Sequence, residues 1–305
     1  MKFFFGKMGF RIERIKTVVE SLNINDINEA NDDTVKYLKS LSLEELESRL
    51  SSVLLPDLSD VSAVKNKLDE HGIIVIPGFV PDEEMQRLQA FVDEIRERAA
   101  SFIESKAPVS EDDHVLLQNG KARLSGYHQL SNHEKAVVQV RKGQDDGMID
   151  IFNVDKWFEE IGHILRPFFE SFSILNVFRL GVERIEAKNL NIYINGNIKK
   201  TRGFHVDSYG KQLKGFVYLT DVSSLDDGPY TYVKGSHVGS AFRRINKHIS
   251  SVLPNKTESP VVPLGDIIPV LAPKGALVIS DQGGVHRGFP QAEGHQRVIA
   301  VMNYT

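Results

Sequence analysis

The stretch Gly-Phe-His-Val-Asp-Ser contains two residues, His205 and Asp207, whose types and spacing suit a metal-binding pair. Side chains two apart on a β-strand point to the same face of the sheet, so both can bind one ion. His286, which follows His205 by 81 residues (286 − 205), offers a second imidazole. Two imidazoles and one carboxylate on one octahedral face leave three positions open, as in non-haem Fe(II) oxygenases. Zinc stays an alternative because imidazole also binds zinc, although zinc proteases carry both histidines on one helix.

A His-x-Asp pair alone is a weak signal, because a chain with 10 histidines forms such pairs by chance and most of them are structural. The residues that accompany the pair make the pattern more specific. After His286 come Gly288, two positions later, and Arg297, 11 positions later (297 − 286). This order of motifs resembles that of the phytanoyl-CoA dioxygenase family of Fe(II)- and 2-oxoglutarate-dependent oxygenases. Two further stretches, 72–79 and 228–237, are similar to the family as well.

The resemblance covers about residues 66 to 305 and implies an enzyme that uses Fe(II), 2-oxoglutarate and O2. It implies that His205, Asp207 and His286 are the metal ligands and the catalytic centre. Arg297 would pair its planar guanidinium with the far carboxylate of 2-oxoglutarate. The expected reaction hydroxylates a small organic substrate and releases succinate and CO2. Because Asp207 is a carboxylate and not the small residue of related halogenases, hydroxylation, desaturation or ring closure is favoured over halogenation.

Two groups of polar residues are weaker site candidates. Alternation along the strand near Asn189 puts Asn191 and Tyr193 on one face, where they could bind the co-substrate or instead face solvent or a neighbouring sheet. Basic residues next to the proposed ligands predict a positive rim that could attract a carboxylated or phosphorylated substrate: Lys199, Lys200, Arg202 and Arg287. Such residues are more often an ordinary solvated surface, so an anionic substrate is one alternative.

Composition and charge limit the class of protein. Of the 305 residues, 41% are hydrophobic, so the chain can bury a substantial core. The chain has no cysteine, which leaves histidine and carboxylate as strong metal ligands and fits a reducing cytoplasm. The net charge of −4 argues against nucleic acid as a partner. No run of about 18 apolar residues indicates a membrane span, and the first residues lack the pattern of a signal peptide. The amphipathic stretch 10–19 is expected to pack on its own domain and not on a membrane surface.

The first 65 residues are expected to form a helical extension with little chemistry in it, followed by a catalytic domain over residues 66–305. In the extension, Ser42 and Glu45 form a capping box, which marks the start of a helix. The other elements expected before the metal-binding motif are a strand at 73–76, helices at 61–70, after Pro81 and at 155–172, and loops with short elements at 105–150.

From residue 183 onward, short alternating runs separated by glycine and proline are typical of a sandwich or double-sheet barrel. The candidate strands are 185–195, 203–209, 213–221, 229–233, 268–272, 275–281 and 295–304. We therefore expect an α+β fold that is mainly β, with a double-stranded β-helix core (jelly roll, cupin-like) and helices packed on one sheet. Residues 238–266 are expected to form a polar insertion that could act as a lid.

Two other classes of function fit parts of the pattern. A zinc or manganese cupin-like isomerase or hydrolase could use the same three ligands, but Arg297 would then have no co-substrate to bind. A non-catalytic jelly-roll module that binds a ligand would have no chemical reason to keep all three metal ligands. The sequence carries no motif that identifies the substrate or the oligomeric state.

Overall fold

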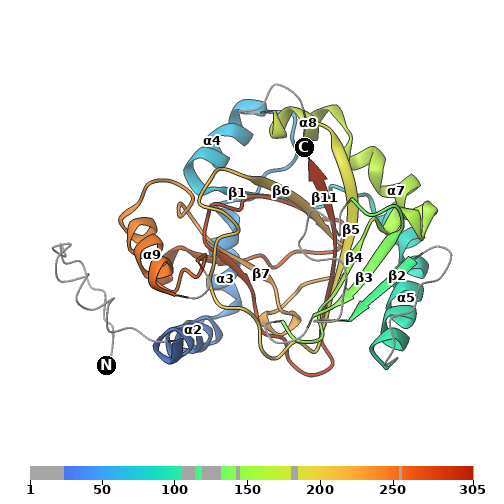
Figure 1. The fold of residues 1–305 in the computed structure, drawn as a ribbon. Helices are drawn as coiled ribbons and strands as arrows, with labels where there is room; N and C mark the ends of the chain where they lie inside the picture. Colours follow the sequence, from blue (N-terminus) through green and yellow to red (C-terminus); the bar gives the residue numbers. More distant parts are fainter. Residues whose placement is uncertain are drawn as a thin grey trace.

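Residues 24–104, 114–118, 132–141, 145–179, 185–253 and 256–304 are described by the computed structural model. Within them, two β-sheets face each other and helices pack on both outer sides (Figure 1). This is the jelly-roll arrangement predicted from the alternating runs in the second half of the chain, and that prediction is confirmed. The amphipathic stretch 10–19 lies outside the described residues.

The larger sheet has eight strands in the order β1-β9-β6-β11-β5-β4-β3-β2. Neighbouring strands run antiparallel except for β2 and β3, which are parallel. The bounds are β1 (Ile73–Ile76), β9 (Leu277–Asp281), β6 (Leu213–Tyr218), β11 (Gln296–Tyr304), β5 (Ala187–Gly196), β4 (Ile149–Phe152), β3 (Ala136–Val140) and β2 (His114–Gln118). The strands expected at 185–195, 213–221, 275–281 and 295–304 are therefore β5, β6, β9 and β11.

The smaller sheet has three antiparallel strands, β10 (His286–Gly288), β7 (Tyr230–Val233) and β8 (Ile267–Pro269), in that order. Side chains of the two sheets meet in one apolar layer, where Phe216 and Tyr218 of β6 join the same cluster as Tyr232 of β7. Because side chains alternate along a strand, Val217 of β6 points the other way and packs under the helices. Inward-facing polar residues of the strands can therefore gather in the interior between the sheets.

Four helices pack on the outer face of the larger sheet: α4 (Val61–His71), α5 (Asp82–Glu104), α7 (Glu159–Phe169) and α8 (Phe172–Phe178). Each helix presents an apolar stripe to the sheet, and in α5 this stripe contains Met85, Leu88, Val92 and Ile95. The apolar cluster under these helices contains the outward side chains of β5, β9 and β11, so the helices brace the strands from which the inward residues project.

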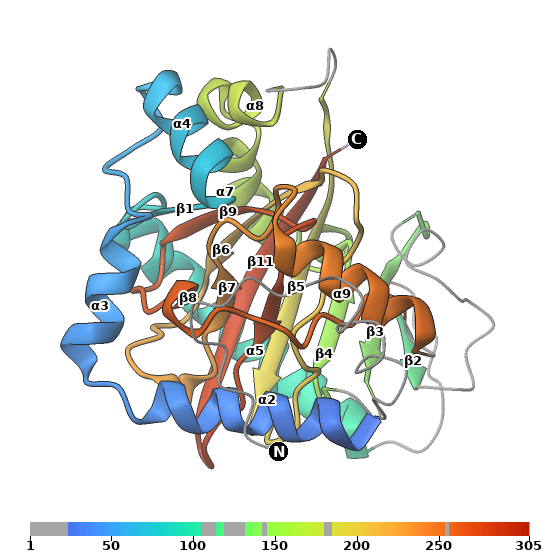
Figure 2. The same cartoon turned by 90° about the vertical axis from the view of Figure 1, so that its left-hand side faces the viewer.

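The N-terminal helices α2 (Ile24–Lys39) and α3 (Leu43–Ser51) pack against the smaller sheet. Leu38 and Leu46 share an apolar cluster with Val233 of β7 and with Phe204. α9 (Ala241–Val252), which lies between β7 and β8 in the chain, has a small apolar cluster of its own. Figure 2 shows α2, α3 and α9 on the side that faces the viewer. Three short 3₁₀ helices complete the described elements: η1 (Val154–Lys156), η2 (Leu225–Asp227) and η3 (Leu264–Asp266).

Two expected elements of the first half differ in the structure. The helix expected at 155–172 is divided into η1, α7 and α8, because the chain turns at Ser171, whose hydroxyl accepts from the amide of Ile174 and begins α8. The region 105–150, expected mainly as loops, contributes β2, β3 and β4 to the edge of the larger sheet. The capping box at Ser42 is present at the start of α3.

The segment expected as a strand at 203–209 forms isolated bridges instead, which join His205 to His286 and to Glu258. The amides of Val206 and Asp207 donate to the carbonyls of Thr257 and Gln282. Because the hydrogen bonds go to several segments and not to one partner strand, no regular ladder develops. The expectation of a regular strand here is wrong, although the residues at its centre are extended enough to pair.

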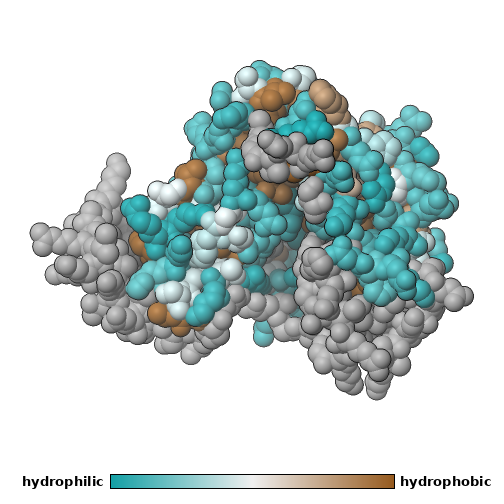
Figure 3. All heavy atoms as spheres, turned by 45° about the horizontal axis from the view of Figure 1, so that its top comes forward, coloured by the Kyte–Doolittle hydropathy of each residue, from teal (hydrophilic) through white to brown (hydrophobic). Residues whose placement is uncertain are grey.

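The surface of the described residues is mostly polar. The face shown in Figure 3 is largely hydrophilic, with hydrophobic residues in small groups. Of the large apolar residues that the structure describes, Phe172 in α8 is the most exposed, at 75%. None of the described helices combines the length and the apolar character that a membrane span needs.

Candidate metal centre

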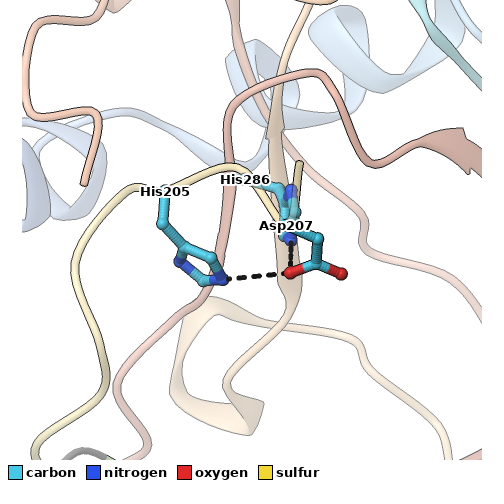
Figure 4. Close-up of side chains that lie close together, drawn as sticks. All are labelled: His205, Asp207 and His286. Carbon is cyan, nitrogen blue, oxygen red and sulfur yellow. Dashed lines mark ion pairs between the residues drawn. The ribbon is translucent and has the colours of Figure 1, made fainter. Parts of the chain in front are cut away.

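The side chains of His205, Asp207 and His286 come together, although His286 lies far along the chain from the other two (Figure 4). Oδ1 of Asp207 lies 3.8 Å from Nε2 of His205 and 3.6 Å from Nε2 of His286. The two imidazole rings have centroids 4.6 Å apart. All three potential ligand atoms lie within 4.8 Å of one another. A metal ion at about 2.0–2.2 Å from each atom would draw them closer, which small side-chain rotations can achieve.

Backbone carbonyls determine which nitrogen of each imidazole carries a proton. Nδ1 of His205 lies 2.8 Å from the carbonyl oxygen of Gly203, and Nδ1 of His286 lies 3.0 Å from that of Gly284. A carbonyl only accepts, so each Nδ1 donates, and a ring that carries its single proton there presents an Nε2 lone pair. Burial, together with the neighbouring imidazole of His286, lowers the pKa of His205 well below its ordinary value and favours the neutral ring. Two lone pairs and the carboxylate of Asp207 therefore converge, and such a set of acceptors needs a cation between them.

Lys214 of β6 holds the other oxygen of the carboxylate. Its Nζ donates to Oδ2 of Asp207 at 3.0 Å. Burial raises the pKa of Asp207, but the charge of Lys214 is the largest of the opposing influences, and the net pKa lies below its ordinary value. Asp207 is therefore ionised, with Oδ1 turned toward the imidazoles and Oδ2 turned toward the ammonium group.

Arg297 of β11 is a buried cation with a side chain that is 5% exposed. Its guanidinium donates to the carbonyl of Gly228 and, at 3.3 Å, to Oδ1 of Asn195. Its Nε has no hydrogen-bond partner, and no carboxylate among the described residues forms an ion pair with it. Burial lowers the pKa of Arg297, yet a guanidinium stays protonated in proteins. A buried charge without a counter-ion is costly, so this site fits an anionic ligand.

Gly288 lies between the metal-binding candidates and Arg297. It stands two residues after His286 on β10, so the two positions face the same side of the smaller sheet. A Cβ at Gly288 would lie 3.5 Å from Nη2 of Arg297. The guanidinium therefore lies beside the strand that carries His286, and the glycine leaves open space next to it.

Asn191, Tyr193 and Asn195 lie on the inner face of β5, as alternation along the strand requires. Asn195 is opposite Arg297 in the β5–β11 register and contacts its guanidinium. Tyr193 is the next inward residue and is 8% exposed. Asn191 is further along and its Oδ1 accepts from the amide of Asn153 at 3.0 Å. The structure thus brings Asn195 to Arg297 and places Asn191 at a backbone contact elsewhere.

The expected positive rim does not form as predicted. Arg202 forms an ion pair with Glu258 at 3.1 Å, and Lys199 pairs with an exposed glutamate. Arg287 is only 3% exposed, because alternation along β10 turns it to the face of the smaller sheet opposite that of His286. Arg202 and Arg287 therefore do not contribute to an exposed rim, whereas Lys199 and Lys200 are exposed, and an anionic substrate stays a prediction.

The insertion that contains α9 packs on both segments that carry the candidate ligands. Arg243 of α9 donates to the carbonyl oxygens of Tyr209 and Gly283. Tyr209 follows Asp207 closely in the chain, and Gly283 precedes His286 closely. One guanidinium thus ties α9 to the two segments, while the role of this insertion as a lid stays a prediction.

Sequence reasoning missed two polar residues of the interior, Lys214 and Asn195. Both stand in alternating runs that point inward: Lys214 shares a face of β6 with Phe216 and Tyr218, and Asn195 shares a face of β5 with Tyr193. A polar residue at an inward position of such a run was the available signal.

A comparison of the sequence with models of known protein families shows the family of the chain. A model of the phytanoyl-CoA dioxygenase (PhyH) family matches residues 68–297, well over half of the chain. The chain belongs to the phytanoyl-CoA dioxygenase family. Members of this family use Fe(II), 2-oxoglutarate and O2, and the three converging acceptors are a suitable donor set for the iron.

The chain is also similar to several solved structures, at low sequence identity. AviO1 from Streptomyces viridochromogenes Tue57 is 16% identical, with 82% of this chain and 96% of that chain covered at a TM-score of 0.51. HygX from Streptomyces hygroscopicus, with nickel, 2-oxoglutarate and hygromycin B bound, is 14% identical, with 79% of this chain and 86% of that chain covered at a TM-score of 0.45. The epimerase SnoN, in complex with Fe3+, alpha ketoglutarate and nogalamycin RO, is 15% identical, with 80% and 84% covered at a TM-score of 0.46. No curated protein sequence matches the chain.

Proposed function

We propose that the chain is a hydroxylase of a small organic molecule that releases succinate and CO2 from 2-oxoglutarate. His205, Asp207 and His286 would bind Fe(II), and Arg297 would bind the far carboxylate of 2-oxoglutarate. One observation carries the proposal: three metal-binding acceptors converge, and beside the strand that carries His286 lies a buried guanidinium that has no carboxylate partner among the described residues.

The residues of the chain orient and separate the reacting groups. Iron and 2-oxoglutarate, when bound, supply an oxidant for a C–H bond of the substrate as the co-substrate loses CO2. The carbonyls of Gly203 and Gly284 hold both imidazoles with Nε2 toward the metal position. Lys214 holds Oδ2 of Asp207, so that Oδ1 would be the oxygen that binds the metal. Arg297 sets how far the co-substrate extends from the metal.

Asn195 and Tyr193 are the other residues that we propose for the co-substrate site. Asn195 already contacts Arg297 and so holds the guanidinium plane, while Tyr193 is the inward neighbour on the same strand. Asn191 is the weakest of the three candidates because its side-chain oxygen accepts from a backbone amide. The cysteine-free composition further leads us to propose a reducing, cytoplasmic setting.

The cupin-like alternative uses the same three ligands without 2-oxoglutarate. An isomerase or hydrolase of this kind would leave the buried charge of Arg297 without a counter-ion, and a non-catalytic module would need neither the metal nor the guanidinium. Membership in a family that uses 2-oxoglutarate also favours the oxygenase.

Anaerobic reconstitution tests the metal and co-substrate assignments. Wild type mixed with Fe(II) and 2-oxoglutarate should develop the visible charge-transfer band of the chelate, and Asp207→Ala should not. Asp226→Ala, which removes a half-exposed carboxylate on η2, is the matched control and should keep the band. A wild type without the band would contradict the proposal.

Isotope labelling tests hydroxylation itself. A panel of small molecules is first screened for stimulated succinate release, and the substrate found is then converted under ¹⁸O₂. Hydroxylation places one ¹⁸O atom in the product. A product without ¹⁸O that is isomeric with the substrate, or that lacks two hydrogens, would indicate epimerisation, ring closure or desaturation and would contradict hydroxylation.

A further inference from the structure

α2 reaches the metal centre from outside the family-matched part of the chain. Asn31 in α2 is 8% exposed, and its Oδ1 accepts a hydrogen bond of 3.2 Å from the amide of Phe204, the residue before His205. The family match begins only at residue 68. A residue of the N-terminal extension therefore contacts the segment that carries a proposed ligand.

The amide that Asn31 binds belongs to the same peptide group that orients His205. This peptide joins Gly203 to Phe204: its N–H donates to Asn31, and its C=O accepts from Nδ1 of His205 at 2.8 Å. The asparagine, the peptide and the imidazole thus form one continuous chain of hydrogen bonds, in which each bond polarises the next. Fixing the plane of the peptide fixes the direction of the imidazole and keeps its Nε2 toward Asp207.

The contact between α2 and this segment is also close enough to require glycine at position 203. A Cβ on Gly203 would lie 2.1 Å from Nδ2 of Asn31, far inside van der Waals contact. The backbone of Gly203 does not need a left-handed conformation, so the close approach of Asn31 is the reason for the glycine. The helix and the ligand-bearing segment are fitted to each other.

His286 has the same arrangement, built entirely within the family-matched region. The carbonyl of Gly284 accepts from Nδ1 of His286, and the N–H of the same peptide, on Val285, donates to Oγ of Ser236 at 2.7 Å. Ser236 is 6% exposed. Each imidazole is therefore held by a glycine carbonyl whose peptide N–H bonds to a buried side-chain oxygen. Ser236 provides that oxygen for one imidazole, and Asn31 provides it for the other.

We propose that Asn31 is a positioning residue of the metal centre, and that α2 is part of this centre and not a separable extension. The inference rests on the proposed function, because it takes His205 as a metal ligand. Other contacts dock the N-terminal helices: Leu38 is fully buried in the cluster on the smaller sheet, and Arg49 of α3 donates to the hydroxyl of Tyr37 at 2.7 Å. Substitution at Asn31 should therefore act on the ligand without undocking the helix.

Anaerobic titration with Fe(II) alone, in competition with a coloured chelator, measures the effect on metal affinity. Asn31→Ala removes the acceptor, Asn31→Asp keeps a side-chain oxygen at the same place, and Asp33→Ala changes an exposed residue of the same helix. Loss of a hydrogen-bond partner of a metal-binding histidine lowers metal affinity about 10- to 100-fold. We expect such a loss for Asn31→Ala, near wild-type affinity for Asn31→Asp, and no change for Asp33→Ala.

Ser236→Ala serves as the internal comparison, since it removes the equivalent oxygen behind His286 and should weaken Fe(II) binding by a similar factor. Visible absorption of the Co(II)-loaded protein gives a second readout that does not depend on activity. Its bands report the ligand geometry, and they should shift in Asn31→Ala and return in Asn31→Asp.

An Asn31→Ala protein with the Fe(II) affinity and the Co(II) spectrum of wild type would overturn this inference alone. Equal weakening by Asp33→Ala would overturn it as well, because it would indicate a general effect of α2. A wild type that binds no Fe(II) would overturn the proposed function and this inference together. Should Asn31→Ala not fold, Asn31→Leu can replace it, because leucine has a similar volume and no hydrogen-bond acceptor. The same changes in Fe(II) affinity and in the Co(II) spectrum are then expected.

Discussion

Replacing Arg297 with leucine removes a buried cation that forms no ion pair with the described residues. A guanidinium has five N–H donors. In Arg297 two of them are used, in the hydrogen bonds to the carbonyl of Gly228 and to Oδ1 of Asn195. The other donors, including the unpartnered Nε, are available to a ligand carboxylate. We expect Arg297→Leu to bind 2-oxoglutarate much more weakly and to bind Fe(II) as wild type does, because the guanidinium donates to none of the three proposed metal ligands.

The size of the loss follows from the hydrogen bonds that a guanidinium makes to a carboxylate. A hydrogen bond to a charged group contributes about 1.5–3 kcal/mol, and a bidentate pair therefore about 3–6 kcal/mol. At about 1.4 kcal/mol per tenfold change, the Kd of 2-oxoglutarate should rise roughly 10²- to 10⁴-fold. Arg297→Lys keeps the charge but loses the planar fork, so its Kd should fall between wild type and Arg297→Leu.

The assay follows the charge-transfer band during anaerobic titration of the Fe(II)-loaded protein with 2-oxoglutarate or with 2-oxopentanoate, which lacks the far carboxylate. Wild type should prefer 2-oxoglutarate by the factor above, and Arg297→Leu should lose this preference. Arg287→Leu is the control, because Arg287 is equally buried but points away from the interior. An Arg297→Leu protein that still prefers the dicarboxylate would refute the assignment of Arg297.

Substitutions at three further positions test other contacts of the site and the fold. Lys214→Met removes the donor to Oδ2 of Asp207, so Fe(II) affinity should fall about 10- to 100-fold in a chelator titration. Gly288→Val should raise the KM for 2-oxoglutarate by crowding Arg297, whereas Gly288→Ala, with its Cβ at an ordinary 3.5 Å contact, should not. Burial lowers the pKa of His237 below the ordinary 6.5, so the unfolded chain binds more protons in acid and stability is lost as pH falls. The melting temperature should therefore drop on acidification through that range, and by less in His237→Gln.

Local patterns located most strands of the larger sheet, and the order of motifs shared with the phytanoyl-CoA dioxygenase family located the metal-binding candidates. The inward positions of β5 follow from a period of two, which does not depend on the partner strand. His205 and Asp207 converge although the segment forms no regular strand, because backbone hydrogen bonds to other segments hold it in place. The spacing from His286 to Arg297 crosses from the smaller sheet to the larger one, so Arg297 could be assigned only through the resemblance to the family.

Arg287 shows where the local pattern was too short. It follows His286 directly, and on a strand the two must face opposite sides. β10 has only three residues, so no alternating run marked it as a strand, and the prediction of an exposed rim missed its burial. Strand length makes the difference between the two arginines. β11 has nine residues with a clear alternation, so the inward position of Arg297 can be predicted, whereas the side that Arg287 faces cannot.

Asn31 carried a signal of a different kind. Together with Thr34 and Leu38 it occupies the buried stripe of α2, at positions i, i+3 and i+7 of the helix. A polar residue on such a stripe must find a partner when it is buried. The pattern can indicate that a partner exists, but only the packed structure identifies it as the peptide before His205.

The segment around His205 depends on parts of the chain outside the two sheets. Phe204 donates its amide to Asn31 of α2, and its carbonyl accepts from the amide of Ser259 in the insertion at 2.7 Å. In a regular strand, both the N–H and the C=O would form hydrogen bonds to neighbouring strands. Here the N–H bonds to the N-terminal extension and the C=O bonds to the insertion. Because buried backbone groups need partners, the position of His205 requires both parts to be docked. A substitution that undocks either part should therefore weaken metal binding before it unfolds the sheets, whose strands pair with one another.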